Sequence, residues 1–181
     1  MVKQESNPDF VGKPFKSVLV VAVTSDEMIR RTYEDRVVAL LGKRRVTGVP
    51  AYSLARTRGK LEEAELRDAI ARSGADGVLI TRVTSVDQST SYVSGTTVAV
   101  GYGGWGGFYG YYGGVWDVAT TAPQKVSGPT WMRSETRLFD ATSGALAWTG
   151  VLDTRQSDDA AKALTDYVNI IFDAMVNDRV L

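Results

Sequence analysis

The sequence contains neither cysteine nor histidine among its 181 residues. Without cysteine there are no disulfide bonds and no thiolate metal sites, and without histidine there are no imidazole ligands. Serine–histidine and cysteine–histidine nucleophilic pairs are excluded for the same reason. Only carboxylates, an activated lysine or a tyrosine remain for catalysis. We therefore expect no enzyme activity, no catalytic residue, no metal site and no bound cofactor.

A net charge and a long apolar run are also lacking. Lys plus Arg number 21, as do Asp plus Glu, so no overall field attracts nucleic acid or an anionic membrane. No apolar run approaches the roughly 20 residues that a membrane-spanning helix needs. Residues 1–14 lack the basic and then apolar plan of a signal peptide. We expect no nucleic-acid partner, and a membrane connection only through an N-terminal lipid anchor that this sequence does not contain.

The order of the apolar patterns predicts one α/β domain. Residues 15–23 are apolar and β-branched, which is typical of a central strand covered on both faces. The apolar residues over 29–41 recur at helical spacing, which predicts a helix. Its outer face is expected to carry Arg30 and Glu34. Its core face is expected to carry Ile29, Tyr33, Val37, Leu40 and Leu41.

The remaining patterns complete the expected fold. They predict strands over residues 49–54, 76–86, 131–140 and 145–154, the last two joined in a hairpin by a turn over residues 141–144. They predict helices over residues 61–73, ended by Gly74, and from Ser157 onwards. We predict a single mixed sheet of about five strands packed by three helices. Residues 15–181 are expected to form this α/β domain, and residues 1–14 a flexible N-terminal segment.

The most unusual segment is residues 95–114, which holds nine of the 18 glycines. We expect it to be the Gly/Tyr-rich tip of a long hairpin insertion, flanked by polar strands over residues 87–100 and 115–126. Residues 101–106 match G-x-G-x-x-G, but the glycines that follow disfavour the helix that a dinucleotide site needs. Two interpretations stay open: a disordered loop, and a partner-binding surface made of Tyr102, Trp105, Phe108, Tyr109, Tyr111 and Tyr112.

Several strings resemble a group of bacterial envelope lipoproteins. They are FKSVLVVAVTSDEMIRRTYEDRVVALL, SGADGVLITRV, the Gly/Tyr-rich insert and LFDATSGALAWTG. More distantly, the order of elements and the strings ADGVLI and DATSGALAW are similar to periplasmic α/β domains of the curli-secretion lipoprotein CsgG, the TolB N-terminal domain and the penicillin-binding-protein activator lipoproteins. The resemblance implies a secreted protein of the periplasm, acylated on an N-terminal cysteine and anchored at the outer membrane. This sequence has no such cysteine, which removal of a signal peptide and of the acylated residue would explain.

Three functional hypotheses follow. The first is a non-enzymatic periplasmic lipoprotein domain that binds an envelope protein or glycan through the aromatic segment. The second is a homo-oligomeric secretion or pore component of the outer membrane, as the likeness to CsgG implies. The third is a small-ligand or nucleotide-binding module. Residues 85–94 are too polar on both faces for the strand of a membrane barrel, which favours the first hypothesis.

Overall fold

Six strands and four helices make up the part of the chain that the computed structural model describes, which is residues 2–8, 10, 14–54, 59–88, 104–119, 130–155 and 159–181. In chain order they are β1 (Val2–Ser6), β2 (Ser17–Val23), α1 (Glu27–Lys43), β3 (Thr47–Pro50), the short 3-10 helix η1 (Ala51–Ser53), α2 (Glu63–Ser73), β4 (Gly77–Gln88), α3 (Gly104–Ala119), β5 (Thr130–Asp140), β6 (Leu146–Arg155) and α4 (Ala160–Asn177).

The six strands form one mixed sheet in the order β1-β6-β5-β4-β2-β3. β2 pairs in parallel with β3 on one side and with β4 on the other. From β4 onwards the sheet is antiparallel, through β5 and β6 to β1 at the far edge. The sheet therefore joins a parallel half, built by helical crossovers, to an antiparallel half that contains the hairpin of β5 and β6.

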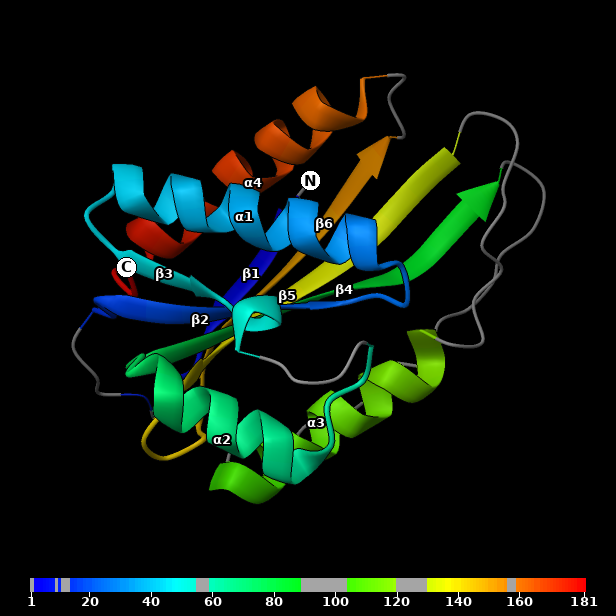
Figure 1. Ribbon diagram of the computed structural model, residues 1–181. Helices are drawn as coiled ribbons and strands as arrows, with labels where there is room; N and C mark the ends of the chain where they lie inside the picture. Colours follow the sequence, from blue (N-terminus) through cyan, green and yellow to red (C-terminus); the bar gives the residue numbers. More distant parts are fainter. Residues whose placement is uncertain are drawn as a thin grey trace.

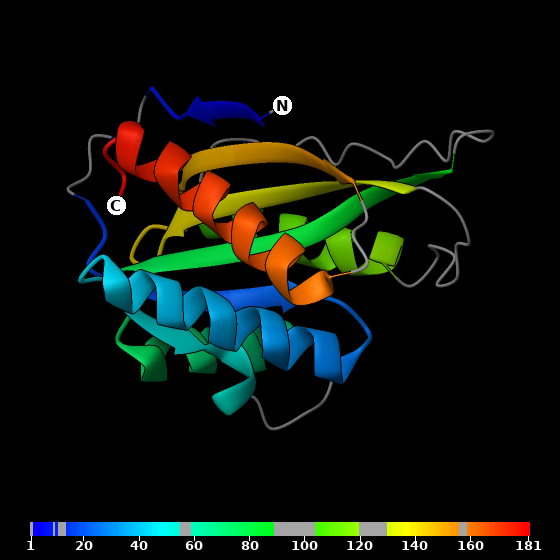
Figure 2. The same ribbon diagram turned by 90° about the horizontal axis from the view of Figure 1, so that it is seen from above.

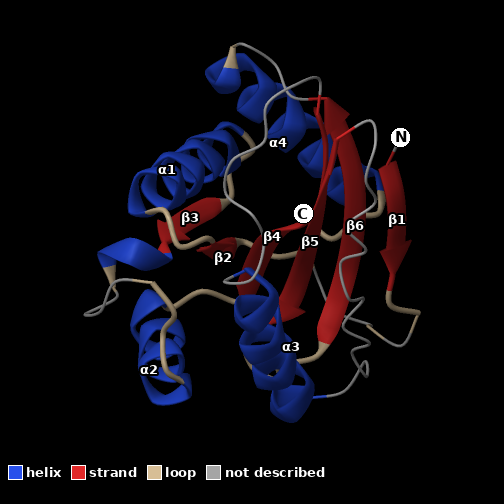
Figure 3. Ribbon diagram, turned by 90° about the vertical axis from the view of Figure 1, so that its right-hand side faces the viewer, coloured by secondary structure: helices blue, strands red, loops and turns tan. Residues whose placement is uncertain are grey.

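Helices cover both faces of the sheet. α1 and α4 lie on one face, and α2 and α3 lie on the other (Figures 1 and 3). Each face has its own apolar core, because side chains alternate between the two faces along a strand. Val18 and Val20 of β2 belong to the core under α1 and α4, whereas Leu19 and Val21 belong to the core under α2 and α3.

The sequence-based fold is confirmed in outline. Residues 18–23 of β2 are all buried between two parallel neighbours, as expected of a central strand. The expected C-terminal hairpin is β5 and β6, and Gly74 ends α2 in the left-handed conformation with a φ of 61°. Val2–Ser6, expected within a flexible segment, is instead the edge strand β1, because its backbone pairs with β6. That residues 15–181 form one domain stays a prediction.

The expected hairpin tip is a helix where the structure describes it. α3 spans Gly104–Ala119 and packs on the sheet, so the prediction of polar strands and a disordered tip is wrong for these residues. The physical reason is that large apolar side chains recur at helical spacing in this segment, so that a helix can bury all of them against the sheet. They are Phe108, Tyr111, Tyr112, Val115 and Trp116. Residues 89–103 and 120–129 of the expected insertion lie outside the described residues.

The expected faces of α1 are also partly wrong. The sequence predicts Arg30 and Glu34 on the outer face, but only 4% and 0% of their surfaces are exposed. It predicts Ile29 in the core, but this side chain is 58% exposed. The inward face of the first two turns therefore carries charge, and the outward face carries apolar side chains.

Candidate functional site

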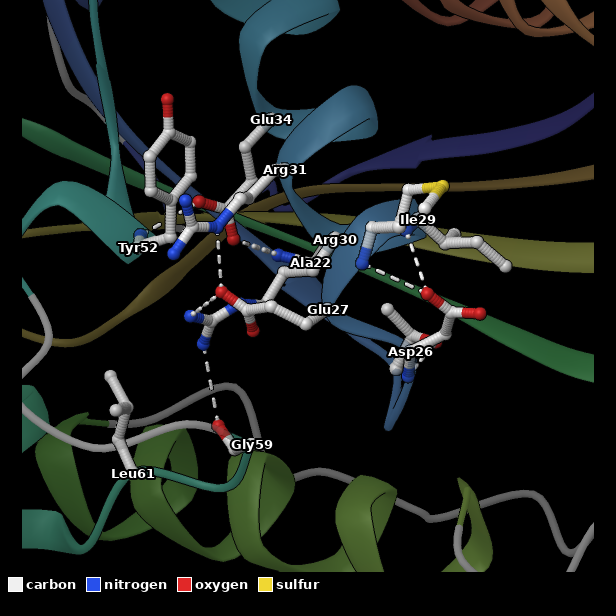
Figure 4. Close-up of polar contacts among 12 residues, drawn as sticks. Ala22, Asp26, Glu27, Ile29, Arg30, Arg31, Glu34, Tyr52, Gly59 and Leu61 are labelled. Atoms are coloured by element: carbon white, nitrogen blue, oxygen red, sulfur yellow. Dashed lines mark hydrogen bonds and ion pairs between the residues drawn. The ribbon is translucent and has the colours of Figure 1, made fainter.

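The carboxyl ends of the parallel strands are the part of such a sheet where α/β proteins place their binding sites. The chain leaves β2 through α1 to reach β3 on one side, and leaves β3 through α2 to reach β4 on the other side of β2. Where connections diverge in this way, a crevice opens at the carboxyl ends of the strands. The first turns of α1, the end of β2 and η1 meet at this place (Figure 4).

Glu34 is the buried centre of the polar cluster at this end of the sheet. Its Oε1 accepts a hydrogen bond of 3.0 Å from the backbone N–H of Ala22, and its Oε2 accepts one of 2.9 Å from the N–H of Tyr52 (Figure 4). The last pair of residues between β2 and β3 is Val20 with Pro50. The carboxyl group of Glu34 therefore accepts hydrogen bonds from N–H groups that lie beyond the paired part of these strands. Burial raises the pKa of Glu34 to about 7, against the lowering effect of these two hydrogen bonds.

Arg30 and Glu27 extend this cluster towards the surface. Glu27 pairs with the buried Arg30 at 3.0 Å and with the half-exposed Arg31 at 2.8 Å. The hydrogen bond from Arg31 is the largest cause that lowers the pKa of Glu27. On its other side, Arg30 Nη1 lies 3.5 Å from the carbonyl oxygen of Gly59, which ties α1 to the segment before α2 (Figure 4).

Above these buried charges lies an exposed surface of mixed character, which we call the α1 surface and which consists of Met28, Ile29, Arg31 and Tyr52. Met28 is 78% exposed and Ile29 is 58% exposed. The guanidinium of Arg31 lies 5.1 Å from the centre of the Tyr52 ring. The hydroxyl of Tyr52 donates to Asp35 at 2.6 Å. Arg31 and Tyr52 are thus held in place, while Met28, which lies one helical turn before Arg31, and the neighbouring Ile29 face solvent.

A second charged cluster lies under α3 on the opposite face of the sheet. Glu135 of β5 pairs with Arg82 of β4 at 2.7 Å and with Arg137 at 2.6 Å. Tyr111 of α3 covers them, with its hydroxyl 3.2 Å from Glu135 and its ring centre 4.3 Å from the Arg137 guanidinium. Two buried guanidinium groups thus share one carboxylate, and Nη1 of Arg82 is buried without a hydrogen-bond partner.

Hydroxyl groups bridge the sheet to the helices on the face of α1 and α4. Tyr33 donates to Thr81 at 2.8 Å, Thr81 lies 2.9 Å from Thr136, and Thr136 lies 2.7 Å from Tyr167. Burial raises the pKa of both tyrosines above their usual value, so they stay protonated at neutral pH. These four side chains satisfy one another inside the core.

The structure places most of the aromatic side chains predicted to bind a partner inside the protein. Phe108, Tyr111 and Tyr112 are 0–3% exposed, so they are not a surface in this conformation. Tyr109 is half-buried beside a shallow hollow between α2 and α3, with the Arg67 guanidinium 4.7 Å from its ring centre. Tyr102 and the side chain of Trp105 lie outside the described residues. Partner binding by this set of six stays a prediction, but for three of them α3 would first have to leave the sheet.

The sequence reasoning missed Arg30 and Glu34 as members of a site. Their spacing of four residues also fits an ion pair on an exposed helix face, and the sequence alone favours that interpretation. The signal that could have found them is the spacing of Arg30, Glu34, Val37 and Leu41, which follows one face of the helix and joins the two charged residues to two apolar ones.

The two buried carboxyl groups of these clusters are both engaged by neighbouring donors. The carboxyl group of Glu34 is occupied by two backbone N–H groups, and that of Glu135 by two arginines. In the part of the chain that the structure describes, no three acidic side chains gather as they would around a metal ion. None of the described helices is both long and apolar enough to cross a membrane.

Comparisons with known proteins find similarity only at the level of structure. No family model and no curated protein sequence matches the chain. A PelC dodecamer from Paraburkholderia phytofirmans aligns over 91% of this chain and 90% of its own, with a TM-score of 0.46 and 13% identity. Lipoprotein GNA1162 from Neisseria meningitidis aligns over 89% of this chain and 98% of its own, with a TM-score of 0.45 and 18% identity. Both likenesses concern the arrangement of helices and strands.

Proposed function

We propose that this chain is a non-enzymatic domain that binds a protein partner in the bacterial cell envelope, and that the α1 surface is its binding site. The observation that carries the proposal is the exposure of Met28 and Ile29 in the first turn of α1, the helix that also carries the ordered pair of Arg31 with Tyr52. Two large apolar side chains in adjacent positions leave apolar area exposed to solvent, and a bound partner would bury that area.

The residue types of the α1 surface support this proposal. Tyr, Met and Arg are enriched in the cores of protein–protein interfaces, and Tyr and Arg are common among the residues that contribute most to affinity. Met28 and Arg31 lie three residues apart on one helix face, and Tyr52 packs beside Arg31 from η1. The apolar and the cationic contacts are therefore presented together.

The buried polar cluster gives this surface its rigidity. Glu27 holds Arg31 at 2.8 Å, and Glu34 holds the backbone of Tyr52 at 2.9 Å. Side chains that are already ordered lose less conformational entropy on binding, which favours affinity. The role of Glu34 and Arg30 is then to position the surface rather than to react.

Placement in the cell envelope, in the periplasm and at the outer membrane through a lipid anchor, rests on the strings that resemble envelope lipoproteins. The non-enzymatic part of the proposal rests on the lack of histidine and cysteine and on the occupied carboxyl groups of Glu34 and Glu135. An oligomeric outer-membrane component and a nucleotide-binding module stay predictions.

The test is capture from a bacterial envelope extract by the immobilised chain, followed by titration of the captured protein with purified variants. We expect the double variant Met28→Ser/Ile29→Ser to weaken binding by about 30-fold, which corresponds to about 2 kcal/mol. Both positions lie in the first turn of α1 and are exposed, so the variant should fold normally.

The matched control is Ile170→Ser/Val176→Ser, which removes the two large exposed apolar side chains of α4. It should leave the affinity unchanged. Equal losses in both double variants would show that general hydrophobicity, and not the α1 surface, causes capture. Unchanged affinity of the Met28→Ser/Ile29→Ser variant would place the binding site elsewhere.

A further inference from the structure

β1 is paired through its backbone with one neighbouring strand. It pairs antiparallel with β6, from Val2 opposite Leu152 to Ser6 opposite Trp148, and lies at the edge of the sheet (Figure 2). The side chains of Gln4, Glu5 and Ser6 are exposed, so they add little apolar burial. A strand held in this way can leave its edge at the cost of a few hydrogen bonds.

The edge that receives β1 also provides specific polar acceptors. Asn7, which is buried, donates its side-chain amide to the carbonyl oxygen of Leu146 at 2.7 Å and its backbone N–H to that of Ala147 at 3.0 Å. The amide of Gln4 lies 3.1 Å from both carboxylate oxygens of Asp178, which follows α4. This edge therefore binds an extended segment that carries amide side chains three residues apart.

Asp178 belongs to the body of the protein whether or not β1 is in place. Its Oδ2 also accepts a hydrogen bond of 2.7 Å from the indole N–H of Trp148, which is fully buried. The position of this carboxylate is thus set by β6 and not by Gln4. The acceptor site is preformed for an incoming strand.

The chain has a natural boundary between β1 and the rest of the domain. Pro8 lies in a turn after Asn7. The next described residue, Phe10, packs on the core and stacks on Phe15, with the ring centres 5.6 Å apart. Residues 2–7 thus form an arm, and the body begins at Phe10. In the sheet, the arm is separated from β2 by three strands.

We propose that the outer edge of β6, together with Asp178, is a strand-acceptor site that the arm of a second copy of this chain fills, so that two copies exchange residues 2–7. Each site is then completed by its partner, and reciprocal exchange closes a twofold dimer. A second copy is the occupant that the contacts favour, because its arm carries the same Gln4 and Asn7 at the same spacing. Exchange preserves the hydrogen bonds that the arm makes to β6 and to Asp178. It opens the turn at Pro8, where the N–H of Phe10 donates to the carbonyl oxygen of Asn7 at 3.1 Å, so this one bond is lost. The proposal is independent of the α1 surface.

Disulfide trapping tests this exchange directly because the chain has no cysteine of its own. Glu5 lies opposite Thr149 in the ladder, and Cα atoms of antiparallel partners lie about 4.5–5.5 Å apart, within the range of a disulfide. We mix the single variants Glu5→Cys and Thr149→Cys at high protein concentration under oxidising conditions. We expect a disulfide-linked heterodimer on a non-reducing gel.

The control mixture is Glu5→Cys with Asp153→Cys, since Asp153 lies four residues further along β6, about 13 Å from Thr149. It should give no heterodimer above background. A heterodimer in neither mixture, or equal amounts in both, would overturn exchange between copies. The double variant Glu5→Cys/Thr149→Cys in one chain shows that the register permits the bond.

A second measurement tests the acceptor site itself. A chain that lacks residues 1–8 should bind a fluorescein-labelled peptide of residues 2–8, followed by fluorescence anisotropy. Replacing Asn7 by Ala in the peptide removes both the side-chain bond to Leu146 and the buried amide, and should weaken binding about 10-fold. Circular dichroism confirms that the shortened chain is folded. No binding by the folded shortened chain, or equal binding of the two peptides, would overturn the site.

Discussion

Glu34 takes the place of a missing strand partner at the end of the sheet. β3 turns away after Pro50 into η1, and the carboxyl group of Glu34 bridges the N–H groups that this turn leaves on Ala22 and Tyr52. A buried N–H without an acceptor is costly, so a polar side chain at this position of α1 is required by the backbone. Burial favours the neutral form of that side chain.

The raised pKa of Glu34 makes its contribution to stability depend on pH. The group titrates at about 7 in the folded protein and near 4.5 when unfolded. The folded state therefore binds more protons between these values, so the stabilisation is complete below about pH 4.5 and is lost as the pH rises through 7. Between pH 5 and pH 8 the loss is about 2 kcal/mol.

We expect Glu34→Gln to lose this dependence, because an amide does not titrate. The amide also leaves one of the two backbone N–H groups without an acceptor, so the variant should be less stable than the wild type, with the larger difference at pH 5 and the smaller at pH 8. Urea unfolding at the two pH values measures this. The control is Glu63→Gln, which breaks an exposed ion pair with Arg67 and should cost less than about 0.5 kcal/mol. A difference for Glu34→Gln that does not change with pH would contradict the assignment.

At the scale of elements, α3 forms against its own helix propensity. Six of its 16 residues are glycine, and each costs about 1 kcal/mol relative to alanine in a helix interior. Docking of the aromatic stripe offsets this cost, since Phe108 packs edge-on against Phe139 with ring centres 5.1 Å apart and Tyr111 covers the charged cluster of β4 and β5. The stability of this helix therefore depends on the contacts of its aromatic side chains with the sheet.

Substitutions on the two faces of α3 should therefore have opposite effects. Phe108→Ala removes a fully buried ring and should destabilise the protein by about 3–5 kcal/mol. Gly110→Ala adds a methyl group that meets no atom within 4 Å, and should stabilise the protein by about 0.5–1 kcal/mol. Thermal unfolding of the two variants measures both effects. If Phe108→Ala were neutral, α3 would not be docked on the sheet in solution.

At the scale of the whole molecule, the end of the sheet where a nucleotide would bind is already occupied by the protein's own groups. The Asp26 side chain accepts hydrogen bonds from the N–H groups of Met28 and Ile29, at 2.9 and 3.0 Å. These are the N–H groups that a phosphate would need at the start of α1, and the carboxylate repels an anion. Behind them, Arg30 pairs with Glu27, and the carboxyl group of Glu34 accepts from two backbone N–H groups.

We accordingly expect calorimetric titration of the protein with ATP, GTP or NAD at millimolar concentration to give no heat above that of dilution. We expect no hydrolysis of the two triphosphates during the same incubation, measured as released phosphate. A known nucleotide-binding protein in the same buffer serves as the positive control. Saturable binding in the micromolar range would contradict this prediction and would favour the ligand-binding hypothesis.

The sequence by itself determined the elements whose signals are local. The apolar run of residues 15–23 predicted the central strand β2, the turn over residues 141–144 predicted the hairpin of β5 and β6, and Gly74 predicted the end of α2. These predictions needed only the period of the pattern and the residues that end it. The lack of histidine and cysteine likewise limits the chemistry of this protein whatever its fold.

Only the tertiary structure decided the features that depend on distant partners. β1 pairs with a strand about 145 residues away in the sequence, and no local pattern in residues 2–6 signals that pairing. The glycines of α3 disfavour a helix, but packing of its aromatic side chains against the sheet outweighs this effect. Glu34 faces inward because β3 ends early and leaves N–H groups that need an acceptor. Arg30 faces inward towards the carbonyl oxygen of Gly59. Propensity and periodicity describe which conformations a segment can adopt by itself. The pairing of β1, the helical state of α3 and the inward face of α1 were decided by the parts of the protein that contact them.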